Sequence, residues 1–120
     1  MQTILVIDDN SDVREVIQLM LEMADYRVVV AVNGSEGIVA FRTHKPDLVI
    51  TDLHLPDMSG VDVVRELREI DRACRVVMVS GSTPREDLHD AAPASSVAIL
   101  PKPFAKHDLL SVVARTLNGS

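Results

Sequence analysis

Four polar features of the sequence each stand at the end of a short apolar run, and together their side chains could do chemistry. Asp8 and Asp9 follow ILVI, Asp52 follows LVIT, Ser80 follows VVMV, and Lys102 lies one residue beyond VAIL. Taken singly, each has an ordinary explanation as a helix cap, a turn residue or a solvated charge. Their coincidence at the ends of apolar runs has no such explanation. We therefore expect three carboxylates, a hydroxyl and an ammonium group to surround one site.

Clustered carboxylates need a cation, because two of them about 4 Å apart repel by about 4 kcal/mol at an effective dielectric near 20. Lys102 supplies one positive charge, and a hard divalent ion supplies two. An all-oxygen ligand set suits Mg²⁺ better than zinc, and the four histidines show no zinc-ligand spacing. Magnesium held by Asp8, Asp9 and Asp52 would leave one oxygen of Asp52 free to attack phosphorus. Asp52 is therefore a candidate nucleophile that forms an acyl phosphate.

The elements that must position these residues follow from hydrophobic periodicity. Apolar runs rich in β-branched residues alternate with segments of helical period, which is the pattern of a parallel sheet with crossover helices. Right-handed crossovers place the carboxyl ends of all strands at one edge, where open α/β sheets bind ligands. The runs are near-continuously apolar, as expected for strands covered on both faces. They predict five strands, at residues 4–7, 28–31, 48–51, 76–79 and 97–100.

Five helices are expected between and after the strands. Each is predicted from a capping residue or turn and from apolar residues at three- and four-residue steps. A short fourth helix should begin after Thr83 and stop at Pro93, and a fifth should run from about Lys106 to Leu117. The first helix starts after Asn10 or Ser11, and its apolar stripe is Val13, Val16, Ile17, Met20, Leu21 and Ala24. The second helix starts near Ser35 and buries Ile38 and Phe41, and the third has the capping-box residues Ser59 and Asp62 and buries Val63, Leu67 and Ile70. The apolar residues of the fifth helix are Leu109, Leu110, Val113 and Leu117.

Composition limits the class of protein. At 120 residues the chain fits a single domain over 1–120, with 118–120 as a native tail or a cloning remnant. The net charge of −6, with no visible basic patch, disfavours direct binding of nucleic acid or an anionic membrane. Cys74 is the single cysteine, so there is no disulfide framework. No apolar run is long enough to span a bilayer, and we expect a soluble, cytoplasmic protein without a removed signal.

These residues, in this order and context, resemble a known family. Asp8 and Asp9 after ILVI, Asp52 in DLHLPDMSG, Ser80 after VVMV, and Lys102 in LPKPF are together similar to the receiver domain of two-component response regulators, the chemotaxis regulator among them. The resemblance covers essentially the whole chain. It implies a flavodoxin-like (βα)5 fold, a doubly wound parallel sheet with strand order 2-1-3-4-5.

The resemblance also implies a role for each matching residue. Asp52 corresponds to the phosphoacceptor, which receives a phosphoryl group from a histidine of a sensor kinase or phosphotransfer protein. Asp9, Asp52 and the backbone carbonyl of His54 correspond to the Mg²⁺ ligands, with Asp8 acting mainly through water. Lys102 corresponds to the lysine that pairs with the phosphoryl oxygens and Ser80 to the hydroxyl that turns toward them. The implied Lys102–Pro103 peptide is cis.

Such a domain catalyses only its own phosphorylation and dephosphorylation, and is not an enzyme toward other substrates. Its output is contact with a downstream protein or with an effector domain outside this chain. Two positions and one stretch depart from the family pattern, the stretch being residues 92–96, which replaces the more usual Gly-containing turn. Ile99 replaces the usual Tyr or Phe, and Gly81 replaces the usual Ala. We expect the phosphorylation chemistry to survive, with backbone displacement at 81–83 and in the following helix replacing the aromatic readout. His54 and Ser82 occupy positions that tune dephosphorylation in the family.

Two other classes of protein share some of these features. A haloacid-dehalogenase-type phosphatase also uses a strand-end aspartate and Mg²⁺, but its first strand should end in a DxD motif, whereas this chain reads DDNSD. A flavodoxin-like cofactor carrier needs backbone amides around a phosphate after the first strand, where Asp8 and Asp9 would repel that phosphate. The receiver interpretation accounts for all the polar strand ends.

Overall fold

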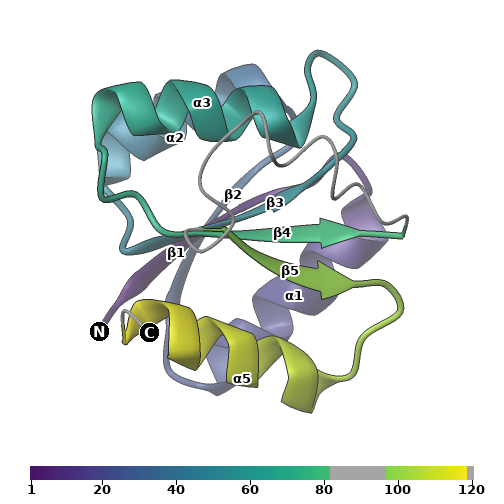
Figure 1. Ribbon diagram of the computed structural model, residues 1–120. Helices are drawn as coiled ribbons and strands as arrows, with labels where there is room; N and C mark the ends of the chain where they lie inside the picture. The colour runs from purple at the N-terminus through teal and green to yellow at the C-terminus, as the bar shows by residue number, and fades with distance from the viewer. Residues whose placement is uncertain (82–96, 119–120) are drawn as a thin grey trace.

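The computed structural model describes residues 1–81 and 97–118. Strands and helices alternate along the described chain, and the strands form one sheet in the order β2-β1-β3-β4-β5 with every neighbouring pair parallel (Figure 1). This is the flavodoxin-like order predicted from the sequence. The elements are β1 Thr3–Ile7, α1 Ser11–Met23, β2 Arg27–Ala31, α2 Gly34–His44, β3 Leu48–Asp52, α3 Gly60–Ile70, β4 Val76–Ser80, β5 Val97–Pro101 and α5 Lys106–Leu117.

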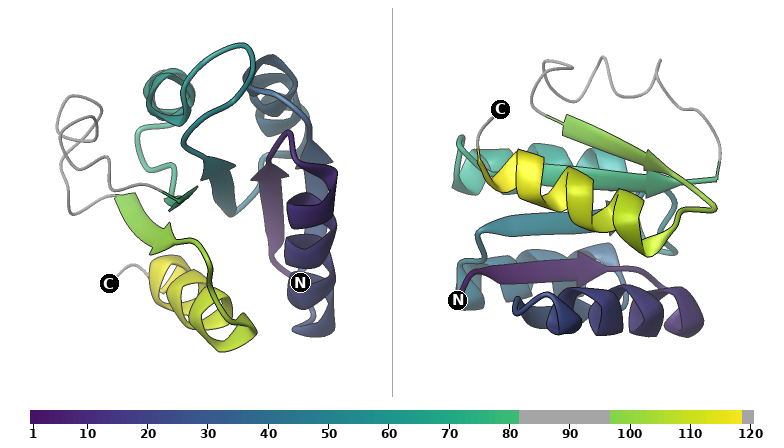
Figure 2. Two further views of the ribbon diagram at one scale, coloured as in Figure 1. Left: turned by 90° about the vertical axis from the view of Figure 1, so that its right-hand side faces the viewer. Right: turned by 90° about the horizontal axis from the view of Figure 1, so that it is seen from below.

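The sheet is covered on both faces, which explains why its strands are so apolar. Helices α1 and α5 lie side by side on one face, and α2 and α3 cover the other (Figures 1 and 2). Alternate residues of each strand therefore belong to two separate cores. Leu5 and Ile7 of β1 pack on the α2 and α3 side, whereas Ile4 and Val6 pack on the α1 and α5 side. The strands are held between two dry layers, so their carboxyl ends have little freedom to shift.

The predicted strands are confirmed to within one residue at each end. All five extend by one polar or proline residue beyond the apolar run, β1 and β2 at the amino end and β3, β4 and β5 at the carboxyl end, because backbone pairing continues past the apolar side chains. Thus Asp52 still pairs with Val79, and Ser80 with Pro101. Both chemically interesting side chains are thereby fixed inside the ladder instead of standing on the loop that follows.

Side-chain caps begin three helices at the expected places. The side chains of Asn10, Asn33 and Ser59 accept hydrogen bonds from backbone N–H groups three residues later, at 3.1, 2.8 and 3.1 Å. Helix α5 spans the predicted residues. The helix expected after Thr83 lies outside the described residues, as does Ser82.

Two residues placed in the core by periodicity are instead exposed. Val16 of α1 has 48 % of its surface exposed, because Ile17 and Leu21 set the buried stripe and the preceding residue points about 100° away from it. Ile70 is 39 % exposed at the last residue of α3, where the helix ends at its cap Asp71. The stripe predictions were wrong at these positions, while Val63 and Leu67 are fully buried.

Gly60 opens α3 at a point where two backbone segments approach closely. A Cβ added at Gly60 would collide with the backbone carbonyl oxygen of Asp52 and lie 2.8 Å from Sδ of Met78. The N–H of Gly60 also donates to the carbonyl oxygen of Leu53, which closes the turn after β3. Only a residue without a side chain fits here, so Gly60 fixes the return of the chain beside Asp52.

Gly60→Ala should therefore destabilise the protein by roughly 1–3 kcal/mol, even though alanine is favoured over glycine in a helix by about 1 kcal/mol. The collision is with backbone, which cannot swing aside as a flexible side chain can. Gly81→Ala is the matched control, since a Cβ there would meet nothing within 4 Å. Urea denaturation measures both variants, and equal midpoints for the two would show that the close approach at Gly60 is unimportant.

Candidate functional site

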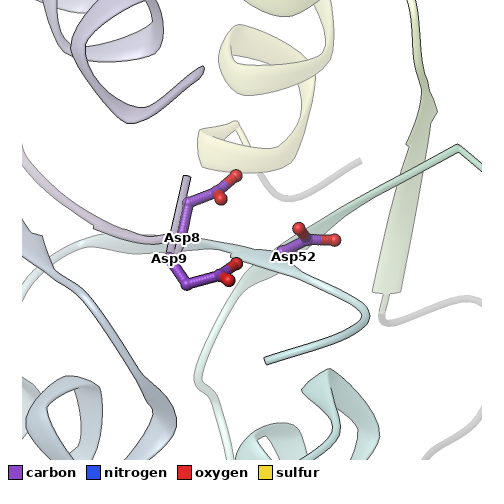
Figure 3. A group of neighbouring side chains, drawn as sticks. All are labelled: Asp8, Asp9 and Asp52. Atoms are coloured by element: carbon purple, nitrogen blue, oxygen red, sulfur yellow. The ribbon is translucent and has the colours of Figure 1, made fainter. Parts of the chain in front are cut away.

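Three carboxylates converge at the carboxyl edge of the sheet. Asp8 and Asp9 follow β1, Asp52 ends β3, and one oxygen from each lies within 4.8 Å of the others (Figure 3). They differ in environment, since Asp8 has 1 % of its surface exposed, Asp52 is half-buried and Asp9 is exposed. The adjacency of β1 and β3 in the sheet brings together residues that are 44 positions apart, Asp8 and Asp52. The expected acidic cluster is present.

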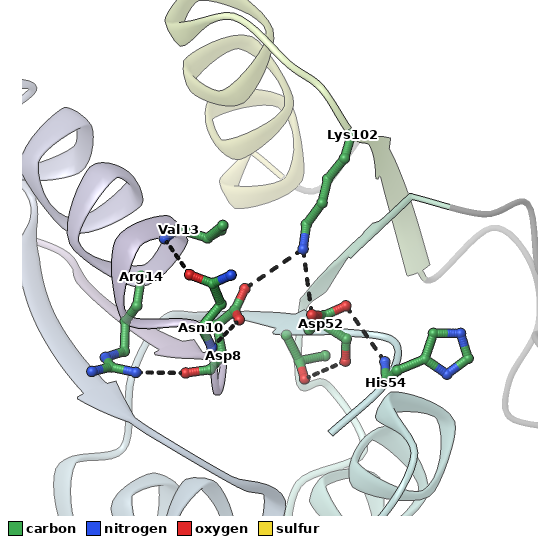
Figure 4. A network of polar contacts seen from close by, with 8 residues as sticks. Asp8, Asn10, Val13, Arg14, Asp52, His54 and Lys102 are labelled. Atoms are coloured by element: carbon green, nitrogen blue, oxygen red, sulfur yellow. Dashed lines mark hydrogen bonds and ion pairs between the residues drawn. The ribbon is translucent and has the colours of Figure 1, made fainter. Parts of the chain in front are cut away.

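Backbone and side-chain bonds hold Asp8 in place. Its N–H donates to the carbonyl oxygen of Ala31 at 3.1 Å, which continues the β1–β2 ladder by one residue. Its carboxylate accepts the N–H of Asn10 at 2.9 Å, and its carbonyl oxygen accepts Nη1 of Arg14 at 2.8 Å (Figure 4). The turn that carries both aspartates is thus tied to β2 and to the first turns of α1.

Lys102 lies across the cluster from the carboxylates. Its Nζ is 3.4 Å from Oδ2 of Asp52 and 3.9 Å from Oδ2 of Asp8, and the ammonium group bridges the two (Figure 4). The backbone N–H of Lys102 donates to the carbonyl oxygen of Ser80 at 2.8 Å, which fixes the chain just beyond β5. The Lys102–Pro103 peptide is cis, as the family resemblance implied. Lys102 is thus ion-paired with two of the three carboxylates.

The remaining predicted residues are placed around this group by the sheet. Ser80 ends β4 and is 1 % exposed, one residue beyond the partner of Asp52 in the β3–β4 ladder. His54 is exposed, and its N–H donates to Oδ1 of Asp52 at 3.4 Å while its imidazole points away from the carboxylates (Figure 4). His54 therefore contributes backbone, not its ring, to the site.

Burial, and to a lesser extent neighbouring negative charges, disfavour the ionised form of Asp8. Burial raises the pKa of its carboxyl group above the usual 3.8, and the charges of Asp52 and Asp9 raise it further. The hydrogen bond from Asn10 and the charge of Lys102 act in the opposite direction without cancelling these effects. A raised pKa means that the ionised form is less stable in the folded protein than in the unfolded chain. The site favours an added positive charge.

The donor set fits magnesium. All three side chains offer hard carboxylate oxygens, the ligands that Mg²⁺ prefers, and a partly open group of few ligands leaves room for the water that this ion keeps. The described residues place no histidine or cysteine with these carboxylates, which disfavours zinc. Cys74 lies elsewhere, buried, and burial raises the pKa of its thiol to about 12, so it stays protonated.

Two residues of the site were missed by sequence reasoning. Arg14 and the backbone of Asn10 both hold the Asp8 turn. Arg14 lies on α1 beside an apolar stripe, where an arginine is ordinarily interpreted as a solvent-exposed charge. Its spacing of six residues from Asp8 matches no local hydrogen-bonding motif, so the sequence did not predict their contact. The capping role of Asn10 was predicted, but the hydrogen bond from its backbone N–H to the Asp8 carboxylate was not.

Fold and site together define a doubly wound α/β domain with a cluster of acidic side chains at the carboxyl edge of its sheet. The chain belongs to the response regulator receiver domain family, whose model matches residues 4–114. These findings give no support to the haloacid dehalogenase alternative. Within the described residues, no helix has the length and apolar character needed to cross a membrane.

Individual relatives agree with this assignment. The chain is 32 % identical to the chemotaxis protein CheY of Bacillus subtilis over 96 % of this chain and 97 % of that protein. It is 36 % identical to the transcriptional regulatory protein KdpE of Mycobacterium tuberculosis over 92 % of this chain, and there it spans about half the length of the relative, 49 %.

Solved structures show the same fold with ligands bound. The Thermotoga maritima response regulator TrrA, in complex with Mg²⁺ and BeF, is similar with a TM-score of 0.87 and 29 % identity, over 97 % of this chain and 99 % of that one. The receiver domain of the Pseudomonas aeruginosa sensor histidine kinase PA1611, with a magnesium ion in its active-site cleft, has a TM-score of 0.88 and 25 % identity, over 98 % of both chains.

The environment of Asp8 predicts that Asp8→Asn raises the melting temperature of the metal-free protein at pH 7. The sign follows from the raised pKa. The wild-type carboxyl contributes stability that is complete below pH 3.8 and is lost as the pH rises through the raised pKa. The advantage of the variant should therefore vanish below about pH 3.8.

Thermal scans in EDTA across this pH range measure the effect. Asp25→Asn is the control, because it removes the same charge from an exposed position where asparagine also tolerates the left-handed backbone, with φ of 68°. Identical pH profiles for the two variants would contradict the claim that crowding at Asp8 costs stability.

Proposed function

We propose that Asp52 is the phosphoacceptor of this receiver domain and takes a phosphoryl group from a phosphorylated histidine. The proposal rests on the charged side chains that surround Asp52. Lys102 lies 3.4 Å from its Oδ2, and two further carboxylates stand beside it at the same sheet edge. A carboxylate in the ladder of β3 has a fixed position, which a nucleophile needs for in-line attack.

Asp9, Asp52 and the backbone carbonyl of His54 would hold Mg²⁺, with Asp8 acting through water. When bound, the ion neutralises charge on the transferring phosphoryl oxygens and on the acidic cluster. The fit of the donor set described above supports this ligand assignment.

The chain's own residues then account for the transfer. An oxygen of Asp52 attacks phosphorus, and the phosphorus–nitrogen bond of the donor breaks, leaving its electron pair on the imidazole nitrogen. Lys102 shifts from its contact with the Asp52 carboxylate to the phosphoryl oxygens, because these carry more negative charge. Ser80, buried at the end of β4, turns its hydroxyl toward the same oxygens. Both side chains gain contacts in the phosphorylated state alone, which supplies the differential energy of a switch.

The partners follow from this chemistry. The donor is a sensor histidine kinase or a histidine phosphotransfer protein, and the domain catalyses no reaction beyond its own phosphorylation and dephosphorylation. Its output is contact with a downstream protein or an effector domain outside this chain, which forms a single domain over 1–120. A net charge of −6 disfavours direct binding of nucleic acid or membrane, and the setting is cytoplasmic.

Incubation with phosphoramidate and Mg²⁺ should add one phosphoryl group per chain, observed by intact mass. Asp52→Asn should abolish the addition, because an amide oxygen is a poor nucleophile toward phosphorus. Asp62→Asn is the control, since it neutralises an exposed carboxylate on α3 that is not part of the acidic cluster. Undiminished labelling of folded Asp52→Asn protein would refute the assignment, and sustained release of phosphate without a labelled chain would favour a phosphatase instead.

A further inference from the structure

The loop that follows Asp52, residues 53–59, is a small closed unit. His54 and Ser59 form an antiparallel bridge across its base, and the N–H of Gly60 donates to the carbonyl oxygen of Leu53. The loop is therefore closed at its base, so the tilt of the loop sets the direction of the His54 carbonyl. Such a loop needs a second attachment to hold a fixed tilt.

Asp57 supplies that attachment at the far end of the loop. Its Oδ1 accepts the N–H of Gly34 at 2.8 Å, and its Oδ2 accepts the N–H and the Oγ–H of Ser35 at 2.9 and 2.8 Å. Both donors belong to the first turn of α2, whose N–H groups have no partner within the helix. The bonds join residues 22 and 23 positions apart, so they fasten the loop to a different layer of the fold.

The neighbouring residue packs into the same junction. A Cβ at Gly34 would collide with Cγ and Sδ of Met58, so the absence of a side chain at the start of α2 makes room for Met58. Met58 is in turn packed against the buried residues between α2, α3 and the sheet. Polar and apolar contacts from adjacent residues thus fix the same end of the loop.

The charge of Asp57 is maintained at neutral pH even though this side chain is exposed. The N–H groups of Ser35 and Gly34 lower the pKa of its carboxyl group below the usual 3.8. The helix N-terminus also favours a negative charge at this position. The attachment persists at neutral pH and weakens as acid protonates the carboxylate.

We propose that Asp57 is a positioning residue for the metal site, which clamps the 53–59 loop to α2 so that the backbone of His54 is held toward Asp52. The inference rests on the proposed function, because it acts through His54 as a magnesium ligand. Asp57 touches neither the metal nor the phosphoryl group. Asp57 instead sets the direction of the His54 carbonyl, which is a backbone ligand and cannot be adjusted by rotating a side chain.

The alternative is that Asp57 merely caps α2, and the chain offers a matched variant to separate the two. The side chain of Asn33 caps the same helix by accepting the N–H of Glu36 at 2.8 Å, but it makes no bond to the loop in the described structure. Asn33→Ala and Asp57→Ala should both lower the melting temperature. If Asp57 only caps α2, the two variants should bind Mg²⁺ with the same affinity. If Asp57 clamps the loop, Asp57→Ala should bind Mg²⁺ more weakly than Asn33→Ala.

Isothermal titration with Mg²⁺ at neutral pH makes the comparison. Asp57→Ala should weaken Mg²⁺ binding roughly tenfold, as is typical when a group that orients a ligand is lost, while Asn33→Ala should bind as the wild type does. Amide NMR of the metal-free proteins is an independent readout. The resonances of His54 and Gly60 should move in Asp57→Ala and stay in place in Asn33→Ala.

Equal Mg²⁺ affinities and unmoved His54 resonances in Asp57→Ala would overturn the clamp and leave the proposed function intact. Failure of the wild type to bind Mg²⁺ would overturn both. If Asp57→Ala does not fold, Asp57→Asn serves in its place, since it keeps the side-chain shape and loses the charge and one acceptor oxygen. Its loss of affinity should then be smaller but in the same direction.

Discussion

Repulsion among Asp8, Asp9 and Asp52 is the constraint on which the rest of the site depends. The charges of Asp52 and Asp9 add to the effect of burial in raising the pKa of Asp8, so the ionised cluster opposes folding. Lys102 offsets part of this cost through its contacts with Asp52 and Asp8. The remaining repulsion favours an added cation, and the hard carboxylate oxygens of the cluster are the ligands that Mg²⁺ prefers.

The fold bears this cost because its strands are fixed independently of the site. Both faces of the sheet are covered by helices, and the central strands are fully buried along most of their length. Neighbouring parallel strands then bring Asp8 and Asp52 to one edge whether or not their charges favour it. Tethers from Asn10, Arg14 and Asp57 act at the loops, where the sheet no longer dictates position.

Local pattern predicted most of this architecture. Continuous apolar runs identified the strands to within one residue, and strand order came from the family resemblance. Val16 and Ile70 were misplaced because periodicity gives the side of a helix but not the width of its buried stripe. Arg14 and Asp57 escaped notice for a different reason. Their partners are backbone groups and, for Asp57, also the hydroxyl of Ser35, reached six residues away in one case and 22 to 23 in the other, and backbone groups leave no signature in the sequence.

A crystal structure of the protein with Mg²⁺ and beryllium fluoride tests the central claim most directly. We expect an ion held by Asp9, Asp52 and the carbonyl of His54, with the fluoride group on Asp52 and Nζ of Lys102 turned onto its fluorines. The 53–59 loop should keep its contacts with the first turn of α2. An ion bound away from the three carboxylates, or a fluoride group on any residue other than Asp52, would contradict the account.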